Sequence, residues 1–388
     1  MKFFNFTEMP YPYVPEDYPE RYGSARVILP NREMDPVKAA DLYRQYLEQH
    51  IYADELGLHI LLNEHHQTIT CTNAACPVMA SVLIPQTKKA QILLLGHPLP
   101  HRENPLRVAE ETAMMDLLSR GRILCGFVRG VGMENHPSNV NPVENRERFY
   151  EAYNLIMKAW TTGEPFSWEG KYFHYRYVNV WPRPYQQPHP PIWTTGGSNN
   201  EQVAWAARNQ LTYACFFVGF ENAARIFDKY RQFSKDAALS NPPASRFGYM
   251  AMVYTAETDE QAEREGKELL WYLHTYEPHW FKFPPGFRTV EERKKIYQPH
   301  RYGGFDPTTA TWEELTKMGV VIAGNPDTVA RRIREFQQMS GAGNLLMMTQ
   351  AGFFAHEKVM KSLELFSREV LPQVQDLGEE NEVSLDRA

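Results

Sequence analysis

The chain has 388 residues, of which 43% are hydrophobic and 23% are charged, as is ordinary for a folded globular protein. Its 41 basic and 47 acidic residues give a net charge of −6, so no broad basic field is available for nucleic acid or anionic lipid. Its four cysteines, without a Cys-x-x-Cys pair, exclude a disulfide scaffold and a common zinc pattern. With no signal peptide and no apolar run of about 18 residues, we expect a cytoplasmic protein without a membrane span.

Eight short runs of the sequence are apolar throughout rather than alternating, which is typical of parallel strands buried on both faces. Segments with helical periodicity separate them, and this alternation indicates right-handed βαβ units. Eight such units predict a (β/α)8 TIM barrel, and a doubly wound open sheet is the alternative. The runs are residues 3–6, 59–62, 92–95, 123–128, 191–195, 213–218, 249–254 and 345–349.

The expected helices are bounded by residues that favour helix ends. Three open where a proline follows a polar residue, at Asp35, Asn104 and Asn325, because proline fits the first helical turn. Further helices are expected over residues 74–84, 144–161, 199–209, 221–238, 258–274 and about 356–374. In the helix after Asp35, the predicted buried stripe is Ala40, Tyr43, Leu47 and Ile51.

Two segments interrupt this alternation. Residues 164–190 are rich in aromatic residues and then in proline, and we interpret them as a hairpin with a stiffened return. Residues 275–320 are long and weakly periodic, which is typical of a functional, lid-like segment. We therefore expect one barrel domain over residues 1–374, followed by an acidic, flexible tail over residues 375–388.

The active site of such a barrel lies at the carboxyl ends of the strands. The second run is followed by Asn63-Glu64-His65-His66. Adjacent histidines on a strand point to opposite faces, so the two cannot easily bind one metal ion. This favours a single histidine in the pocket that donates or accepts a proton. Arg129 follows the fourth run and can hold a phosphate or form a structural ion pair.

The fifth run is followed by a glycine-rich turn, Gly196-Gly197-Ser198, that opens a helix. Its backbone N–H groups suit a phosphate, although Ser198 can also be a simple helix cap. Arg146 begins another helix, where the helix dipole disfavours a cation. A nearby anion or a surface ion pair are equally good explanations for Arg146.

Taken in order, these motifs resemble the bacterial luciferase-like flavin monooxygenase family. The resemblance covers about residues 1–220 well and residues 320–372 more loosely. It is carried by residues 62–66, 104–110, 119–122, 126–130, 146, 196–198 and 324–329.

The resemblance implies a barrel with insertions that binds FMN without a covalent bond. His65 matches the histidine that supports oxygen chemistry, and Glu64 belongs to the same catalytic motif. The implied cofactor-binding residues are Arg129, Arg146 and Ser198 at the phosphate with Gly196 and Gly197 beside them, and Leu95 and Gly96 at a non-prolyl cis peptide under the flavin ring. We expect the substrate pocket to include Phe6, Glu8, Asn63 and His97, and we expect no metal.

The implied activity is that of a reduced-FMN-dependent monooxygenase that activates O2 as a flavin 4a-hydroperoxide. It would oxygenate a small, largely apolar organic substrate by hydroxylation or Baeyer–Villiger insertion. No second nucleotide-binding domain is visible, so a separate NAD(P)H:flavin reductase is the expected partner. The resemblance also implies a homodimer, or a higher homo-oligomer, formed through helices beside the early strands.

Three alternatives remain open on the sequence. The first is a deazaflavin-dependent oxidoreductase of the same fold. The second is a non-catalytic flavin-binding protein, against which the presence of His65 argues. The third is a metal-dependent barrel hydrolase that uses Glu64, His65 and His66 as ligands.

Overall fold

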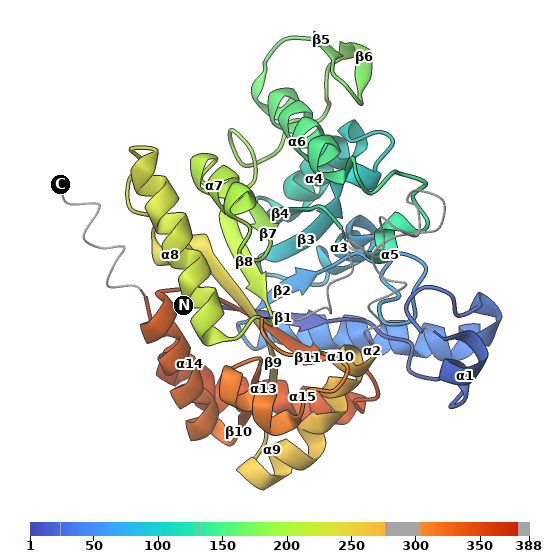
Figure 1. The fold of residues 1–388 in the computed structure, drawn as a ribbon, viewed down its shortest axis with the longest axis vertical. Coiled ribbons are helices and arrows are strands. Elements are labelled where there is room, and N and C mark those ends of the chain that lie inside the picture. The colour runs from blue at the N-terminus through green and yellow to red at the C-terminus, as the bar shows by residue number, and fades with distance from the viewer. Residues whose placement is uncertain (24, 131, 276–302, 379–388) are drawn as a thin grey trace.

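The eight apolar runs form the strands of a closed parallel barrel, as predicted (Figure 1). The computed structural model describes residues 1–23, 25–130, 132–275 and 303–378. Neighbouring strands follow the order β1-β2-β3-β4-β7-β8-β9-β11, and β11 pairs with β1 to close the ring. The strands are β1 (Lys2–Thr7), β2 (His59–Leu62), β3 (Ile92–Pro98), β4 (Ile123–Val128), β7 (Ile192–Thr195), β8 (Thr212–Phe216), β9 (Phe247–Thr255) and β11 (Asn344–Gln350).

One further parallel strand, β10 (Val321–Gly324), was not predicted from the sequence. It pairs with the second half of β9, whereas the first half of β9 pairs with β8. β9 is nine residues long, so its edge extends beyond the end of β8. β10 has only four residues, and so short an apolar run carries little signal of its own.

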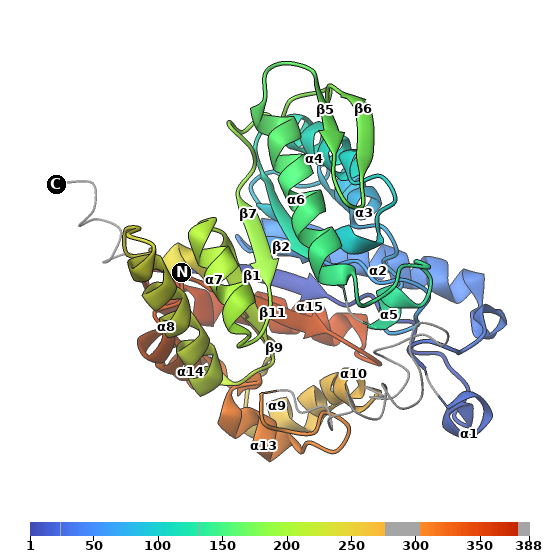
Figure 2. The same cartoon turned by 45° about the horizontal axis from the view of Figure 1, so that its top comes forward.

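The predicted hairpin is present as β5 (Phe166–Glu169) and β6 (His174–Val178), which pair antiparallel. It stands outside the barrel beside α6 (Asn145–Thr161) (Figure 2). Glu151 of α6 accepts the backbone N–H groups of Lys171, Tyr172 and Phe173, at 2.9–3.0 Å. The carboxylate thereby fixes the turn of the hairpin against the barrel.

Helices surround the barrel, and the capping residues identified in the sequence begin several of them. Asp35 accepts the N–H groups of Val37 and Lys38 at the start of the second helix. The helices are α1 (Tyr18–Tyr22), α2 (Pro36–Glu55), α3 (Cys76–Leu83), α4 (Leu106–Ser119), α5 (Gly132–Asn135), α6, α7 (Asn200–Arg208), α8 (Phe220–Asp236), α9 (Asp259–Gly266), α10 (Trp271–His274), α13 (Trp312–Met318), α14 (Pro326–Ser340), α15 (His356–Leu365) and α16 (Leu371–Val374).

The predicted buried stripe of α2 was wrong by one position. The helix buries Ala39, Leu42, Tyr46 and Ala53, whereas Ala40 is exposed. Apolar residues occupy both adjacent rows of this helix, so periodicity alone does not choose between them. The contact of α2 with β1 and β2 makes the choice.

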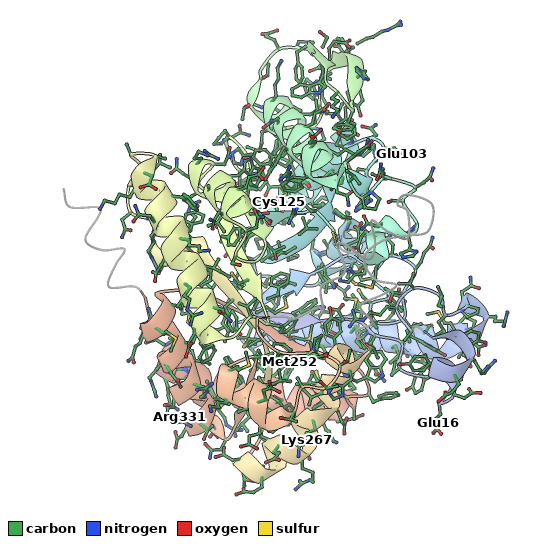
Figure 3. The ribbon with its side chains drawn as sticks, in the orientation of Figure 1. Glu16, Glu103, Cys125, Met252, Lys267 and Arg331 are labelled. Carbon is green, nitrogen blue, oxygen red and sulfur yellow. The ribbon has the colours of Figure 1, made fainter. Side chains whose placement is uncertain are left out.

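Large side chains fill the interior of the barrel below its carboxyl ends. The rings of Phe4 on β1 and Trp193 on β7 meet edge to face, with centroids 5.7 Å apart. A Cβ atom on Gly248 of β9 would lie only 2.9 Å from the Trp193 indole, so the glycine makes room for it. Figure 3 shows Cys125 and Met252 among the strands and charged residues such as Arg331 outside. Because the interior is filled below, the space for a ligand lies at the carboxyl end of the barrel.

Parts of two predicted segments lie outside the described residues. These are residues 276–302 of the expected lid and residues 379–388 of the expected tail. The described remainder of the lid segment contains α13, which contacts β10. Over the described ranges, no helix combines the length and the apolar character that crossing a bilayer requires.

Candidate active site

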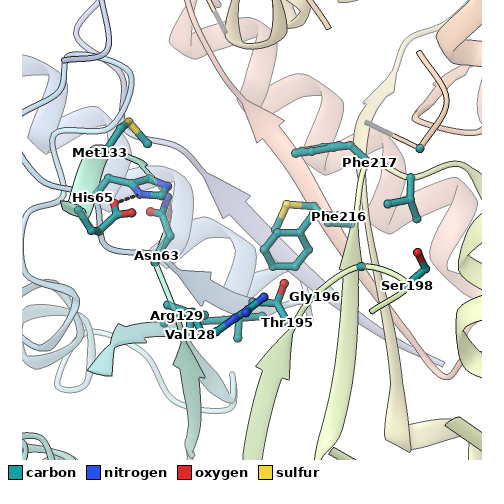
Figure 4. A pocket seen from close by; sticks show the side chains of 18 of the residues that line it. Asn63, His65, Val128, Arg129, Met133, Thr195, Gly196, Ser198, Phe216 and Phe217 are labelled. Carbon is teal, nitrogen blue, oxygen red and sulfur yellow. Dashed lines mark hydrogen bonds and ion pairs between the residues drawn. The ribbon is translucent and has the colours of Figure 1, made fainter. Parts of the chain in front are cut away.

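A cavity of about 1120 Å³ opens at the carboxyl ends of the barrel strands. Its floor is largely apolar and comes from seven strands of the barrel (Figure 4). Two groups of polar residues face each other across it: His65 and Asn63 follow β2 on one side, and Gly196 and Ser198 follow β7 on the other. The floor residues are Phe6, Leu95, Val128, Thr195, Phe216, Met250 and Met348.

The peptide bond between Leu95 and Gly96 is cis, as the resemblance implied. Both residues line the cavity. β3 and β4 approach each other closely here: a Cβ atom on Gly96 would lie 2.5 Å from the carbonyl oxygen of Gly126, and one on Gly126 would lie 2.4 Å from that of Leu94. The two glycines therefore let β3 and β4 approach closely, and Gly96 presents bare backbone in the floor, on which a flat ring can lie.

Arg129 and the glycine turn are joined by Gln202 of α7. Arg129 donates to Gln202 Oε1 (2.9 Å), and Gln202 Nε2 donates to the carbonyl of Thr195 (2.7 Å). A Cβ atom on Gly196 would lie 2.4 Å from the Tyr213 hydroxyl, so the turn presents backbone to the cavity. Arg129, Gly196, Gly197 and Ser198 all line it. A cation, small residues and a helix start form a cradle that fits a phosphate.

Three further cations surround this cradle. Arg146 of α6 lines the cavity and forms an ion pair with Glu201 at 2.6 Å, which confirms the ion-pair interpretation, whereas its binding of an anion stays a prediction. Arg225 and Lys229, one turn apart on α8, also line it. Lys229 donates to Asn200 Oδ1 (3.1 Å) at the start of α7. The sequence analysis missed Arg225 and Lys229, although their spacing of four on one helix face was a usable signal.

On the opposite side, the His65 imidazole lies between two carboxyl groups. His65 Nδ1 is 2.6 Å from Oε1 of Glu134 on α5, and His65 Nε2 is 3.6 Å from Oε1 of Glu8. Burial by itself would lower the pKa of His65, but the two carboxyl groups outweigh burial and raise it. Glu134 was not identified from the sequence, because it lies in a short helix with no recognisable motif.

Glu64 also lines the cavity, but its carboxylate is already engaged. Oε1 accepts from Arg102 and from His66 Nε2, the latter at 2.9 Å, and Oε2 accepts the N–H of Cys76 at 3.2 Å. Burial by itself would raise the pKa of Glu64, but the hydrogen bond from His66 and the charge of Arg102 lower it to about 2. These contacts favour a positioning role over the catalytic role expected from the sequence.

His97 is the one expected pocket residue that does not line the cavity; Phe6, Glu8 and Asn63 do. The register between β3 and β4 shifts at the cis peptide, and the His97 ring is fully buried near α3, with Nδ1 3.9 Å from the Cys76 sulfur. Among the described residues, His97, Cys76 and Glu64 form the one cluster of potential metal ligands, with atoms within 4.8 Å of one another. This cluster differs from the trio predicted for a metal hydrolase, and the cation Arg102 already occupies its carboxylate.

Comparison with known proteins gives the family. The family model described as luciferase-like monooxygenase matches residues 26–342, which is most of the chain. This chain belongs to the luciferase-like monooxygenase family. A curated relative, the 3,6-diketocamphane 1,6-monooxygenase of Pseudomonas putida, is 24% identical over 357 residues, covering 84% of this chain and 91% of the relative.

Solved structures of other proteins share the fold of this luciferase-like chain. The oxygenating constituent of 3,6-diketocamphane monooxygenase from P. putida, solved in complex with FMN, has a TM-score of 0.73 at 21% identity, covering 96% of this chain and 97% of that one. An F420-dependent secondary alcohol dehydrogenase, solved with an F420–acetone adduct, has a TM-score of 0.67 at 16% identity, covering 88% and 96%. The shared fold therefore accommodates both a flavin and a deazaflavin.

Proposed function

We propose that this luciferase-like protein is a reduced-FMN-dependent monooxygenase that oxygenates a small, largely apolar molecule. The observation that carries the proposal is the arrangement of one cavity. A phosphate cradle around Arg129 lies across a cis-peptide floor from the His65–carboxyl group. The FMN bound by the P. putida relative of the same fold supports this choice of cofactor.

In this proposal the chain's residues divide the work along the cavity. Arg129, Arg146 and the N–H groups of residues 196–198 hold the phosphate through charge-assisted hydrogen bonds. The bare backbone at Leu95 and Gly96 supports the flat ring system. Bound reduced FMN would supply the electrons that activate O2.

The other residues act on protons and on water. His65 holds or releases a proton at Nε2, while Glu134 fixes its Nδ1–H. Met133 and the floor residues Phe216, Met250 and Met348 give the cavity an apolar lining that excludes water and accepts an apolar substrate. Neither hydroxylation nor Baeyer–Villiger insertion is favoured by these residues over the other.

The test is cofactor binding and its dependence on Arg129. We expect FMN fluorescence to be quenched on binding and the FMN Kd to rise roughly ten- to hundredfold in Arg129→Met, because a charge-assisted hydrogen bond is lost. Arg183→Met, in the loop after the hairpin, is the matched control and should bind like the unmodified protein. Mixing the reduced-FMN complex with O2 should then give a transient absorbance that free FMN does not show.

A deazaflavin is the second candidate cofactor. It is favoured by Arg225 and Lys229, which extend the cationic rim beyond the cradle, and by the F420-dependent protein that shares the fold. Tighter binding of the deazaflavin than of FMN in the same titration would overturn the proposal and favour hydride transfer to or from a substrate.

The proposed activity needs a source of electrons, for which we propose a separate NAD(P)H:flavin reductase. We also propose a homodimer formed through α3 and α4, which lie side by side beside β3 and β4. These two helices expose a strip of apolar side chains that a second copy of the chain would cover. The strip consists of Val78, Val82, Met114, Leu117 and Leu118.

A further inference from the structure

Glu8 follows β1 directly and is held in the wall of the cavity by backbone pairing. Its N–H donates to the carbonyl of Gln350 at the end of β11 (3.0 Å). Only 1% of the residue is exposed, although it lines the cavity. An acidic side chain at such a position is uncommon, because an ionised carboxylate is costly to bury unless it is well paired.

The hydrogen bonds of Glu8 distinguish its two oxygen atoms. Oε2 accepts from Asn63 Nδ2 at 3.1 Å. The side-chain oxygen Oδ1 of Asn63 in turn accepts from the Cys71 thiol at 3.4 Å, which sets the orientation of the amide. Oε1 has no hydrogen-bond partner among the described residues and lies 3.6 Å from His65 Nε2. A neutral carboxyl group suits these surroundings, with Oε2 as the carbonyl oxygen and a proton on Oε1.

His65 can accept a proton from such an acid when its imidazole is neutral. Glu134 Oε1, 2.6 Å from Nδ1, accepts the Nδ1–H of the imidazole. When His65 is neutral, Nε2 is therefore the acceptor, and it faces the protonated Oε1 of Glu8. Two protons are then shared among Glu8, His65 and Glu134, and moving one from Glu8 to Nε2 leaves the net charge of the group unchanged.

We propose that Glu8 is a second acid of this site, which stores a proton on Oε1 and supplies it through His65 Nε2 to an oxygen atom that gains negative charge in the cavity. In this step the Oε1–H bond breaks and an Nε2–H bond forms; His65 then gives up that proton, and Glu8 regains one from solvent. No electron is transferred. The proton store is a property of this chain, whereas its catalytic use rests on the proposed function.

The charges around Glu8 support this protonation state. Burial raises the pKa of Glu8 to about 7, although His65, Arg26 and the Asn63 hydrogen bond each lower it and Glu134 raises it slightly. The groups that face it are His65 after β2, Glu134 on α5, Arg26 in the loop before α2, and the Cys71 thiol. Because the pKa is raised, the proton is present below pH 7 and is lost as the pH rises through that value.

The first experiment is infrared spectroscopy of the flavin-free protein as a function of pH. We expect the C=O band of a protonated carboxyl group at pH 6, disappearing with a midpoint near pH 7, and absent from Glu8→Gln. Glu20→Gln, on the exposed helix α1, should keep the band. A band that is missing at pH 6, or that persists in Glu8→Gln, would overturn the proton store.

A second variant guards against misfolding of Glu8→Gln. Asn63→Ala keeps the acid but removes a hydrogen bond that lowers its pKa, so the midpoint of the same band should move to higher pH. An unchanged midpoint would count against the assignment of the band to Glu8.

The second experiment tests the catalytic use of the proton. With reduced FMN bound, we expect the rate of the step with O2 and substrate to fall as the pH rises through 7, and to be lower by on the order of 100-fold, with an altered pH profile, in Glu8→Gln. FMN binding, measured separately by fluorescence, should not change. An unaltered pH profile in Glu8→Gln would overturn the catalytic role of Glu8. Failure of the unmodified protein to bind FMN would reject the proposed function, and the infrared result on the proton store would still stand.

Discussion

At the contact between Gly96 and Gly126, the absence of two side chains decides the shape of the cavity floor. A Cβ atom at Gly126 would lie 2.4 Å from the carbonyl of Leu94, which is backbone and has little room to move. The cis peptide joins Leu95 to Gly96, which is one of the two glycines in this contact. At the scale of single residues, the floor therefore depends on two positions that carry no side chain, Gly96 and Gly126.

We predict that Gly126→Ala lowers the free energy of unfolding by about 1–3 kcal/mol, because the added methyl group overpacks the contact between β3 and β4. Urea denaturation measures the change. Gly163→Ala is the matched control, since a Cβ atom there meets nothing within 4 Å. Equal stability of the two variants would show that β3 and β4 can move apart without cost, and it would contradict the proposed importance of this close contact for the floor.

At the scale of elements, Arg122 connects three consecutive parts of the barrel. Its guanidinium donates to the carbonyls of Ile84 (2.8 Å) at the end of α3 and of Ala90 (3.0 Å) just before β3, and to the Thr87 hydroxyl (2.9 Å). Its Nε donates to the carbonyl of Ser119 at the end of α4. One side chain thus satisfies carbonyl groups that the ends of both helices leave unpaired.

We predict that Arg122→Met costs about 3 kcal/mol of unfolding free energy, because several carbonyls lose a charged donor at once. Arg107→Met on α4 is the control: Arg107 is 60% exposed in its ion pair and should contribute less than about 1 kcal/mol. Chemical denaturation compares the two. A loss at Arg122 no larger than that at Arg107 would contradict the connecting role.

At the scale of the whole molecule, the strip on α3 and α4 is one apolar surface that a single copy leaves exposed. Leu118 is 65% exposed and Val78 is 65% exposed, although both belong to helices whose other faces pack on the barrel. Leu117 of the same strip is 41% exposed, and a second copy of the chain would cover it in the proposed dimer.

We predict that Leu118→Glu converts the proposed dimer to a monomer, because burying a carboxylate at an apolar interface costs several kcal/mol. Sedimentation equilibrium measures the mass in solution. Met339→Glu is the control: Met339 is an apolar residue of α14, on the opposite side of the barrel in Figure 1, it is 45% exposed, and its replacement should not change the mass. A dimer that survives Leu118→Glu would place the interface elsewhere.

The sequence by itself determined the barrel and some of the polar residues on each side of the cavity. Continuous apolar runs specify buried parallel strands, and parallel strands bring their carboxyl ends to one side. The sequence therefore predicts that His65, Arg129 and Gly196 lie at the same end of the barrel, and all three line the cavity.

Only the tertiary structure decided which residues complete those groups. Glu8 was expected in the pocket, but only the structure places its carboxyl group beside His65. Glu134 meets the same imidazole from 69 residues further along the chain, and Lys229 reaches the start of α7 from a neighbouring helix. His97 went to the outer face because the register of β3 shifts at the cis peptide. Periodicity describes one element at a time, whereas such contacts depend on how elements pack, which local sequence patterns do not encode.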